Sequence, residues 1–524
     1  MCFLYRPCRV SICGRKGIIM HIFSTLFTAQ SVDKDLRTPE GREEAARWCR
    51  EAGITKVYVE SFRRVFIEQE LLETARDFFE NEGFEVDGCV TTVGFPKNSV
   101  DSKTEVPCLS HKPNWDYMEQ IFRRTAAVFD TIMIDDFLFS TCECDECKAA
   151  AGGRSIEQYH SDAMHEMSVE RILAPSYEVN PHCQVIIKYP NWYDRYYARG
   201  YDTIRQTEVF DQTWIGNETR EPDSERWGRY PQTMAFYIQD WCMKLDYEKC
   251  MGGWYDAFTT LPATYLEQAR NTILGGARES MLFCYRLLHE EQEGMDDIAA
   301  LCPEIEGLHK LAYLVSGKKA VGVSVPKKPN ADVAEDRFIN GMYGMLGIPA
   351  VADVELDYGA DAAILGVQAK EYPDVRMYAR EMAADGTPVA FTRRFLEFSG
   401  LEAPEGAVIF DPGDDIWNLC AIEQGELDVL RNKLLAPFGV EFCAPARVAL
   451  NLYDDDMEVI QNFNDAPVDV TLKLGRGASP YARKRNGKAR KIALTLSRDK
   501  QATFSRDGCT YKLTLPPRTL VVLY

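Results

Sequence analysis

Residues 131–136 read TIMIDD, an apolar run typical of a buried β-strand, followed at once by two carboxylates. The same arrangement, a short apolar run that ends in polar or ionisable residues, recurs as far as about residue 290. Helical patterns lie between these runs; residues 41–52, for example, follow the helix-start signal Thr38-Pro39-Glu40. The eight predicted strands are Gly17–Phe27, Lys56–Ser61, Glu85–Val93, Thr131–Asp136, Gln184–Tyr189, Val209–Gly216, Gly252–Asp256 and Ser280–Tyr285.

Eight strand–helix repeats over about 250 residues predict an α/β fold of the (β/α)8 TIM barrel type. A doubly wound open sheet would have fewer strands and would tend to show a Gly-rich phosphate turn after its first strand, which this sequence lacks. Beyond the barrel, residues 320–392 alternate between strand and helix patterns, which predicts a small α/β unit with a parallel sheet. From Ala444 onward the apolar residues alternate with period two, which predicts a C-terminal antiparallel β-sandwich. The predicted domains are 1–310, 311–442 and 443–524.

The composition is that of a globular protein with a large core. Of the 524 residues 46% are apolar, and 60 basic against 80 acidic residues give a net charge of −20. These values exclude a disordered or collagen-like chain. The negative charge disfavours nucleic acid or an acidic membrane face as the partner, whereas neutral small molecules such as sugars remain open.

The cysteines and the N-terminal residues indicate the cellular compartment in which the protein works. Seventeen cysteines are an odd and scattered set, so we expect most of the thiols to be reduced and buried. Arg15-Lys16 precede the mostly apolar residues 18–29, which resemble a secretory signal. The alternative, that residues 17–27 form the first strand of the barrel, is favoured because the strand count needs it. We therefore predict a cytoplasmic protein, with secretion as the alternative, and no membrane partner.

The ends of the predicted strands carry the candidate chemistry, because active sites of such barrels lie at the carboxyl ends of the strands. Acidic side chains interleaved with Trp and Tyr suit a carbohydrate, since aromatic faces pack on sugar C–H groups and carboxylates bind hydroxyls. Two facing carboxyl groups can cleave a glycosidic bond without an organic cofactor. The candidate substrate-binding residues are Glu60, Asp135, Lys188, Trp192, Tyr193, Trp214, Arg220, Trp254 and Tyr285.

Asp135 and Asp136 are adjacent in the predicted strand 131–136, so we expect only one to face the barrel axis and the other to bond to backbone or to an arginine. Arg220, two residues after Glu218, could hold a carboxylate ionised, grip a substrate oxygen or form a surface ion pair.

A cysteine cluster, Cys142-x-Cys144-x-x-Cys147, follows the fourth predicted strand. Three thiolates at this spacing, with Cys108 from the preceding loop as the fourth ligand, predict a structural tetrahedral Zn²⁺ site; reduced, unliganded cysteines are the alternative. A catalytic zinc is disfavoured because the sequence has no HExxH motif. His160 and His165 are five apart on a predicted helix, and we expect them at the surface.

These features resemble glycoside hydrolase family 42, the β-galactosidases. The Cys108 and Cys142–Cys147 cluster is similar to that family's zinc cluster, and residues 275–286 are similar to its Ala-His-Gly-Ala-Asp segment and the strand that follows. Residues 459–464 resemble the opening strand of the family's C-terminal sandwich. The resemblance implies a Rossmann-like middle domain of the trimerisation type, and hence a homo-oligomer, a dimer or a trimer.

The resemblance also implies catalytic roles. The family carries an Asn-Glu pair where this chain has Asp135-Asp136, and a Glu nucleophile where this chain has Asp256. We therefore expect an exo-acting glycoside hydrolase in which Asp136 is the general acid/base. Its partner is Asp256 by family position, or Glu218 if the site has been rebuilt. Because an Asp side chain is about 1.5 Å shorter than Glu, both the retaining mechanism and the galactose specificity remain open.

Two further hypotheses belong to other classes. A metal-assisted hydrolase or lyase could use the same barrel mouth, although the sequence shows no second cluster of His and carboxylate ligands. A sugar-binding relative without catalysis would follow if the Glu-to-Asp departures had removed the carboxylate pair.

Overall fold

The computed structural model describes residues 21–100, 104–484, 489–497 and 501–524, so residues 17–20 of the first predicted strand lie outside the described part. Its centre is a closed barrel of eight parallel strands, as predicted, in which β1 pairs with both β2 and β9. A short strand, β3 (Val65–Phe66), extends β2 on the outside. The barrel strands are β1 (Ile22–Phe27), β2 (Lys56–Arg63), β4 (Glu85–Thr91), β5 (Thr131–Ile134), β6 (Gln184–Tyr189), β7 (Gln212–Gly216), β8 (Cys250–Asp256) and β9 (Glu279–Phe283).

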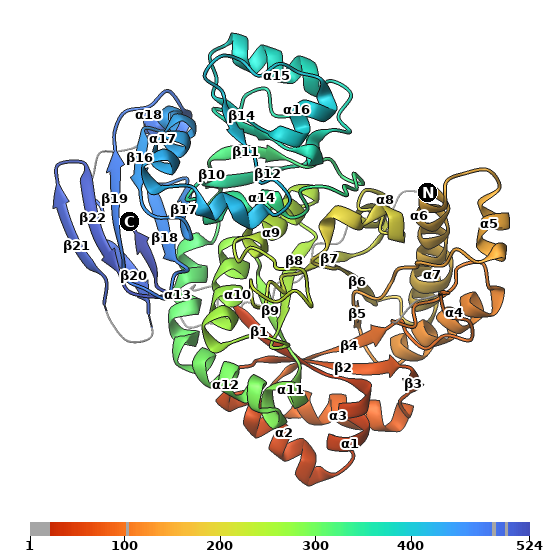
Figure 1. Cartoon of the computed structure of the whole chain (residues 1–524). Coiled ribbons are helices and arrows are strands. Elements are labelled where there is room, and N and C mark those ends of the chain that lie inside the picture. Colours follow the sequence, from red (N-terminus) through yellow and green to blue (C-terminus); the bar gives the residue numbers. More distant parts are fainter. Residues whose placement is uncertain (1–20, 101–103, 485–488, 498–500) are drawn as a thin grey trace.

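Helices surround the barrel, and local signals set where several of them begin (Figure 1). Thr38 caps α2 by accepting a hydrogen bond from Gly41 N, with Pro39 in the first turn, and Ser155 caps α6 in the same way. The barrel helices are α1 (Ala29–Asp35), α2 (Pro39–Glu51), α3 (Gln69–Asn81), α4 (Lys112–Ala126), α5 (Asp145–Ala151), α6 (Ile156–Met167), α7 (Ala174–Val179), α8 (Arg205–Val209), α9 (Met234–Leu245), α10 (Pro262–Leu274), α11 (Tyr285–Glu290), α12 (Gln292–Leu301) and α13 (Ile305–Val315).

The middle unit contains a parallel five-stranded sheet of order β12-β11-β13-β14-β15. It packs on α9, where Tyr237 donates to Val325 O and Trp241 donates to Lys327 O. Its elements are β11 (Val323–Pro326), α14 (Ile339–Met345), β12 (Ala350–Asp353), β13 (Ala363–Leu365), α15 (Val375–Ala384), β14 (Val389–Thr392), α16 (Arg393–Ser399), β15 (Val408–Phe410) and α17 (Gln424–Leu435).

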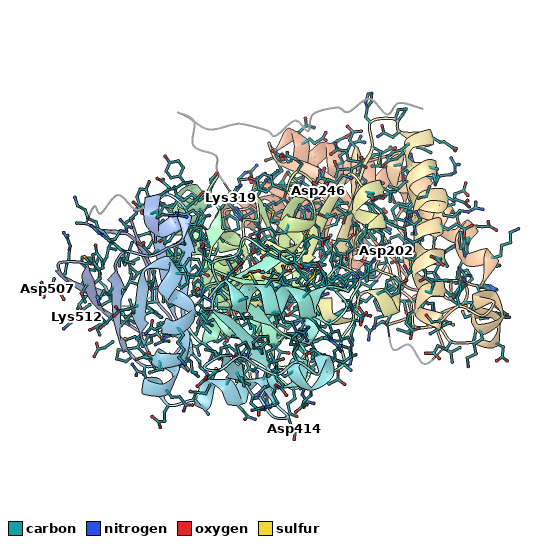
Figure 2. All side chains as sticks on the ribbon, turned by 90° about the horizontal axis from the view of Figure 1, so that it is seen from above. Asp202, Asp246, Lys319, Asp414, Asp507 and Lys512 are labelled. Carbon is teal, nitrogen blue, oxygen red and sulfur yellow. The ribbon has the colours of Figure 1, made fainter. Side chains whose placement is uncertain are left out.

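The C-terminal part forms two antiparallel sheets, of order β10-β17-β18-β23-β20 and β16-β19-β22-β21. Asp507 and Lys512 mark the outer edge of the second sheet, at the end of the molecule away from the barrel (Figure 2). The assignment of the middle unit as Rossmann-like and of the C-terminal part as a β-sandwich stays a prediction, as do the domain boundaries. The elements are β10 (Ala320–Val321), β16 (Val440–Cys443), β17 (Val448–Tyr453), β18 (Met457–Asn462), β19 (Val468–Leu474), α18 (Pro480–Lys484), β20 (Ile492–Leu496), β21 (Thr503–Asp507), β22 (Thr510–Leu515) and β23 (Leu520–Leu523).

Residues 320–326, at the start of the predicted small α/β unit, form two strands that belong to different sheets. β10 pairs with β17, whereas β11 pairs with β12 and β13. Gly322 separates them, and a Cβ there would lie 1.9 Å from Pro349 O, so the backbones approach closely only because glycine has no side chain. Of the helices in the described residues, none is both long and apolar enough to cross a bilayer.

Candidate active site

A buried lysine marks the mouth of the barrel, where the carboxyl ends of the strands meet. Lys188, on β6, donates to Asp136 Oδ2 at 3.0 Å and to Glu218 Oε1 at 2.9 Å, and lies 3.5 Å from Asp135 Oδ1. Burial alone would lower the pKa of Lys188, but the three carboxylates together raise it. The loops after β5 and β7 thus bring three of the predicted site residues to one ammonium group.

Both Asp135 and Asp136 reach Lys188, although alternation along a strand predicted that only one would face the axis. The reason is that β5 ends at Ile134, so neither aspartate lies in a strand. Asp135 accepts hydrogen bonds from Asp136 N at 2.8 Å and from Arg63 at 3.0 Å, as expected for the member of the pair with a supporting role. Burial opposes ionisation of Asp135, but Lys188 and Arg63 outweigh it and lower its pKa.

Glu60 lies beneath this cluster and is fully buried. Its carboxylate accepts hydrogen bonds from Arg63, from Ala29 N at 2.6 Å and from Thr91, which also contacts Asp135. A carboxylate with this many donors is held in place. Glu60 therefore supports Arg63 and Asp135 from below.

Asp136 differs from Asp135 in the direction of its pKa shift. The pKa of Asp136 is raised to about 7, chiefly by burial and also by the carboxylates of Asp135 and Glu218, while Lys188 opposes the rise. A carboxyl group whose pKa lies near neutral pH can donate a proton and take it back. Its side chain is 20% exposed, so a substrate can reach it, whereas that of Lys188 is 1% exposed.

One carboxylate oxygen of Glu218 has no hydrogen-bond donor in the described part of the chain. Lys188 binds its Oε1, whereas its Oε2 is buried and has no hydrogen-bond partner among the described residues. Asn191 donates to the backbone oxygen of Glu218 at 2.8 Å and fixes the loop that carries it. A buried carboxylate oxygen without a donor is costly and is available for reaction with a ligand.

Asp256, the last residue of β8, is held differently. Arg220 donates to both of its oxygens, at 2.9 and 2.7 Å, in the two-pronged geometry that guanidinium and carboxylate share. The Arg220 guanidinium also lies 4.2 Å from the centre of the Trp227 ring. Asp256 thus has its oxygens occupied, whereas Glu218 does not.

The predicted aromatic residues fall into two groups. Trp254 lies at the mouth, with the Lys188 ammonium 4.0 Å from its ring centre and Phe283 stacked on it at 5.2 Å, and Trp192 is half-buried in the loop after β6. Tyr193, Trp214 and Tyr285 are buried, as Trp254 is, and among the described residues no cation–π contact with Lys188 is seen for their rings. They pack on other rings, which are Phe338 and Tyr237 for Tyr193, Tyr58 for Trp214, and Phe27 and Trp48 for Tyr285.

The four predicted zinc ligands, Cys108, Cys142, Cys144 and Cys147, come together, with all sulfur atoms within 4.8 Å of one another. The Cys108–Cys144, Cys108–Cys147 and Cys144–Cys147 sulfur distances are 3.8, 3.7 and 3.7 Å. Zinc–sulfur bonds of about 2.3 Å in a tetrahedron give sulfur–sulfur edges of about 3.8 Å. The thiols therefore fit a tetrahedral metal, and within the described ranges no other group of three His, Cys, Asp or Glu side chains could hold one.

His160, expected at the surface, is buried. Its ring nitrogens contact Cys142 O at 3.0 Å and Ala198 O at 3.1 Å, so it connects the cysteine loop to the loop after β6. The prediction was wrong because the spacing of His160 and His165 argues only against shared metal ligation. It does not indicate whether either side chain packs in the core.

Sequence reasoning also missed three residues of the site. Arg63 was not considered because β2 extends three residues beyond Glu60, Thr91 is an ordinary strand residue, and Asn191 acts through its side-chain amide on a neighbouring loop. The only signal for Arg63 was its position three residues after a buried glutamate.

The arrangement can carry acid–base chemistry. Because Asp136 Oδ2 and Glu218 Oε1 share one ammonium nitrogen at 3.0 and 2.9 Å, these two oxygens lie within about 6 Å of each other. One carboxyl group has its pKa near neutral pH and the other is bonded to a cation. A substrate bond placed between them could be protonated on one side and attacked on the other.

Three known proteins illustrate what the chain is similar to. "Uncharacterized protein SSO3021" of Saccharolobus solfataricus is 23% identical over 334 residues, which are 57% of this chain and 55% of that protein. The chain thus matches only about half the length of that relative. Among solved structures, α-L-fucosidase isoenzyme 2 from Paenibacillus thiaminolyticus superposes with a TM-score of 0.59 over 96% of this chain and 99% of that chain, at 12% identity. Exo-β-1,4-mannosidase Op5Man5 from Opitutaceae bacterium strain TAV5 covers 88% of this chain and 90% of its own, with a TM-score of 0.45 and 8% identity.

A family profile gives the most direct result. The profile described as "Probable glycosyl hydrolase, catalytic domain" matches residues 14–299, which include the whole barrel and every carboxylate described above. The chain therefore belongs to this family of probable glycosyl hydrolases, with the barrel as its catalytic domain.

Proposed function

We propose that this glycoside hydrolase removes a terminal sugar from a small glycoside or from a chain end, with Asp136 and Glu218 as the catalytic pair. The observation that carries the proposal is the arrangement around Lys188, which bonds to both carboxylates while leaving Glu218 Oε2 free. The depth of the site supports an exo mode, since Glu218 and Lys188 are nearly inaccessible and only a chain end could reach them.

The roles follow from the environment of each group. Asp136, with its pKa raised to about 7, donates its proton to the leaving oxygen, and Glu218 Oε2 attacks the anomeric carbon as that bond breaks. Asp136, now ionised, then takes a proton from the water that releases the sugar. Lys188 holds Glu218 Oε1 at 2.9 Å and so positions the carboxylate for the attack by Oε2. The short spacing of the pair favours net retention, since inverting pairs are about 6.5–9.5 Å apart.

Asp256 was the alternative partner by family position. Its two bonds to Arg220 favour a role in binding sugar hydroxyls or in fixing the loop after β7. The galactose specificity that the family 42 resemblance implies stays a prediction, as do the homo-oligomer and the cytoplasmic location.

We also propose that the four cysteines bind a structural Zn²⁺. Their sulfur distances support this, and four thiolates leave no open coordination position, so the ion would fix the loops around the mouth and take no part in catalysis.

A panel of 4-nitrophenyl glycosides of several sugars in both anomeric forms tests the proposal. We expect at least one to be cleaved with retention, observed by proton NMR of the first sugar released. With that substrate, Glu218→Ala in the presence of azide should give a glycosyl azide of the opposite configuration. Full activity of both Glu218→Ala and Asp136→Asn would show that the pair is wrongly assigned.

A further inference from the structure

Two arginines lie in the loop after β6, beside the proposed catalytic pair. The loop makes two short 3-10 turns, Tyr193–Arg195 and Tyr197–Arg199, and each turn ends in an arginine. Asn191, at the start of the same loop, donates to Glu218 O at 2.8 Å. The loop is therefore anchored directly to the residue that carries the free carboxylate oxygen.

These two arginines have no acidic partner, unlike the others at the mouth. Arg63 is paired with Glu60 and Asp135, and Arg220 with Asp256. Within the part of the chain that the structure describes, no carboxylate lies within ion-pair distance of the Arg195 or the Arg199 guanidinium. Asp332 is the carboxylate whose charge acts on the pKa of Arg199. It does not form an ion pair with Arg199, because it accepts hydrogen bonds from Tyr197 N and Ala198 N.

The Arg199 guanidinium is held in place by aromatic rings. Its carbon lies 4.6 Å from the centre of the Trp192 ring and 5.6 Å from that of Phe139. Stacking fixes the plane of the guanidinium and leaves its edge N–H groups free to donate. Burial and the neighbouring Arg195 both lower the pKa of Arg199, so an anion bound between the two would relieve an existing repulsion.

Tyr230 connects these arginines to the catalytic carboxylate. Burial raises the pKa of the Tyr230 phenol to about 12, while Arg220, Arg195 and Arg199 lower it and Glu218 raises it. The charges of both arginines and of Glu218 therefore act on the same hydroxyl group. The geometric link is the loop itself, which Asn191 bonds to Glu218 O and in which Arg199 packs on Phe139, three residues after Asp136.

We propose that the substrate is an anionic saccharide, whose carboxylate or sulfate group is bound by Arg195 and Arg199 while Glu218 and Asp136 act on its glycosidic bond. The inference rests on the proposed function and adds the substrate class. It explains why unpaired cations lie at this mouth in a chain whose net charge is −20. A guanidinium fork matches a carboxylate with two parallel hydrogen bonds, so a uronic acid is the expected form.

Calorimetry on the full-length Asp136→Asn variant tests the inference without turnover. The probes are the 4-nitrophenyl glycosides of glucuronic and galacturonic acid, their neutral glucose and galactose counterparts, and a 6-sulfated galactoside, each in both anomers. We expect an anionic glycoside to bind at least ten times more tightly than its neutral counterpart at 20 mM salt, with the ratio falling as salt rises. The uronic and the sulfated probes distinguish the two kinds of anion.

Substitution identifies the groups responsible. Adding Arg195→Gln and Arg199→Gln should abolish the preference for the anion and leave binding of the neutral glycosides unchanged. Arg199→Lys should recover only part of the preference, because an ammonium keeps the charge but not the fork. The matched control is Arg376→Gln with Arg380→Gln, which removes two exposed charges from α15 and should change nothing.

The outcomes separate the two proposals. If neutral glycosides are hydrolysed and bind as tightly as the anionic ones, the substrate class is wrong and the hydrolase assignment stands. If the anionic preference is found but the control pair abolishes it equally, the two loop arginines are not the cause. If no glycoside of either class is bound or cleaved, the proposed function fails first.

Discussion

Each end of the barrel contains a lysine that faces carboxylates and an aromatic ring, and the two ends differ in the number and the exposure of these carboxylates. At the amino ends of the strands, Lys56 bonds to Asp87 at 2.7 Å and to Glu279 at 3.1 Å, and lies 4.8 Å from the Tyr58 ring centre. At the carboxyl ends, Lys188 faces three carboxylates and lies 4.0 Å from the Trp254 ring centre.

What distinguishes the upper cluster is an accessible carboxyl group with a raised pKa. Burial, together with repulsion from Asp135 and Glu218, raises the pKa of Asp136 to about 7, and its side chain is 20% exposed. In the lower cluster burial also raises the pKa of Glu279, but that side chain is only 7% exposed. This contrast agrees with the general division of such barrels into a stabilising lower end and an active upper end.

The largest expected effect is loss of activity on changing the upper cluster. Glu218→Gln and Asp136→Asn should each lower kcat/KM by about 10³-fold or more, since each removes a group that acts in the transition state. The melting temperature should change little. Kinetics on the best glycoside of the panel and a thermal melt measure both quantities. Asp87→Asn in the lower cluster is the control; an equal loss of activity there would remove the distinction between the two ends.

The next effect is on stability and comes from the lower cluster. Lys56→Met leaves Asp87 and Glu279 without their cation, and breaking a buried pair in this way costs about 3 kcal/mol. The melting temperature should fall by several degrees, while kcat/KM at 25 °C stays as in the wild type. If Lys56→Met melts at the wild-type temperature but has lost activity, catalysis takes place at the amino ends of the strands and the assignment of the active site is wrong.

Loss of the proposed zinc ion should lower the melting temperature by less than Lys56→Met does. Elemental analysis should find one zinc per chain, and Cys142→Ser should lose it and lower the melting temperature, because two loops at the mouth lose their common anchor. Cys509→Ser, which changes an exposed cysteine outside the cluster, is the control. Zinc binding that survives Cys142→Ser would disprove the four-ligand site.

The smallest effect is a shift in pH dependence. Asp136 must be protonated to act as an acid, and its raised pKa of about 7 means that kcat/KM should fall as pH rises through 7. Asp135 raises that pKa by repulsion, so Asp135→Asn should move the fall to lower pH, by roughly one unit. Asp87→Asn should leave the profile unchanged. A fall that moves to higher pH in Asp135→Asn would contradict the acid role of Asp136.

The barrel could be predicted from the sequence because its strands are buried on both faces. Such strands appear as short apolar runs that end in polar residues, and the predicted strand 184–189 matches β6 at both ends. β12 and β15, of the middle sheet, were not predicted. The position of Gly322 between two sheets depends on Pro349, which is distant in sequence and gives no local signal.

The sequence indicated which residue types gather at the mouth but not how they pair. Strand ends indicated Lys188, Asp136, Glu218 and Asp256, and the structure places these side chains near the mouth because the fold alone brings strand ends together. Which carboxylate keeps a free oxygen depends on where Arg220 and Lys188 point, and this is a matter of rotamers that no spacing encodes. The burial of Trp214 and Tyr285 could not be predicted for the same reason, since an aromatic side chain near a strand end can turn into the core or into the mouth.

Closure of the barrel by β1 affects how the chain is made. β1 pairs with β2 on one edge and with β9 on the other, and β9 begins at Glu279, about 250 residues later. On a ribosome that adds roughly 5–20 residues each second, the second edge of β1 stays open for between about ten seconds and a minute. During that interval the nascent protein exposes an unpaired, apolar strand edge, so its yield in a cell should depend on chaperones that shield such edges until translation reaches β9.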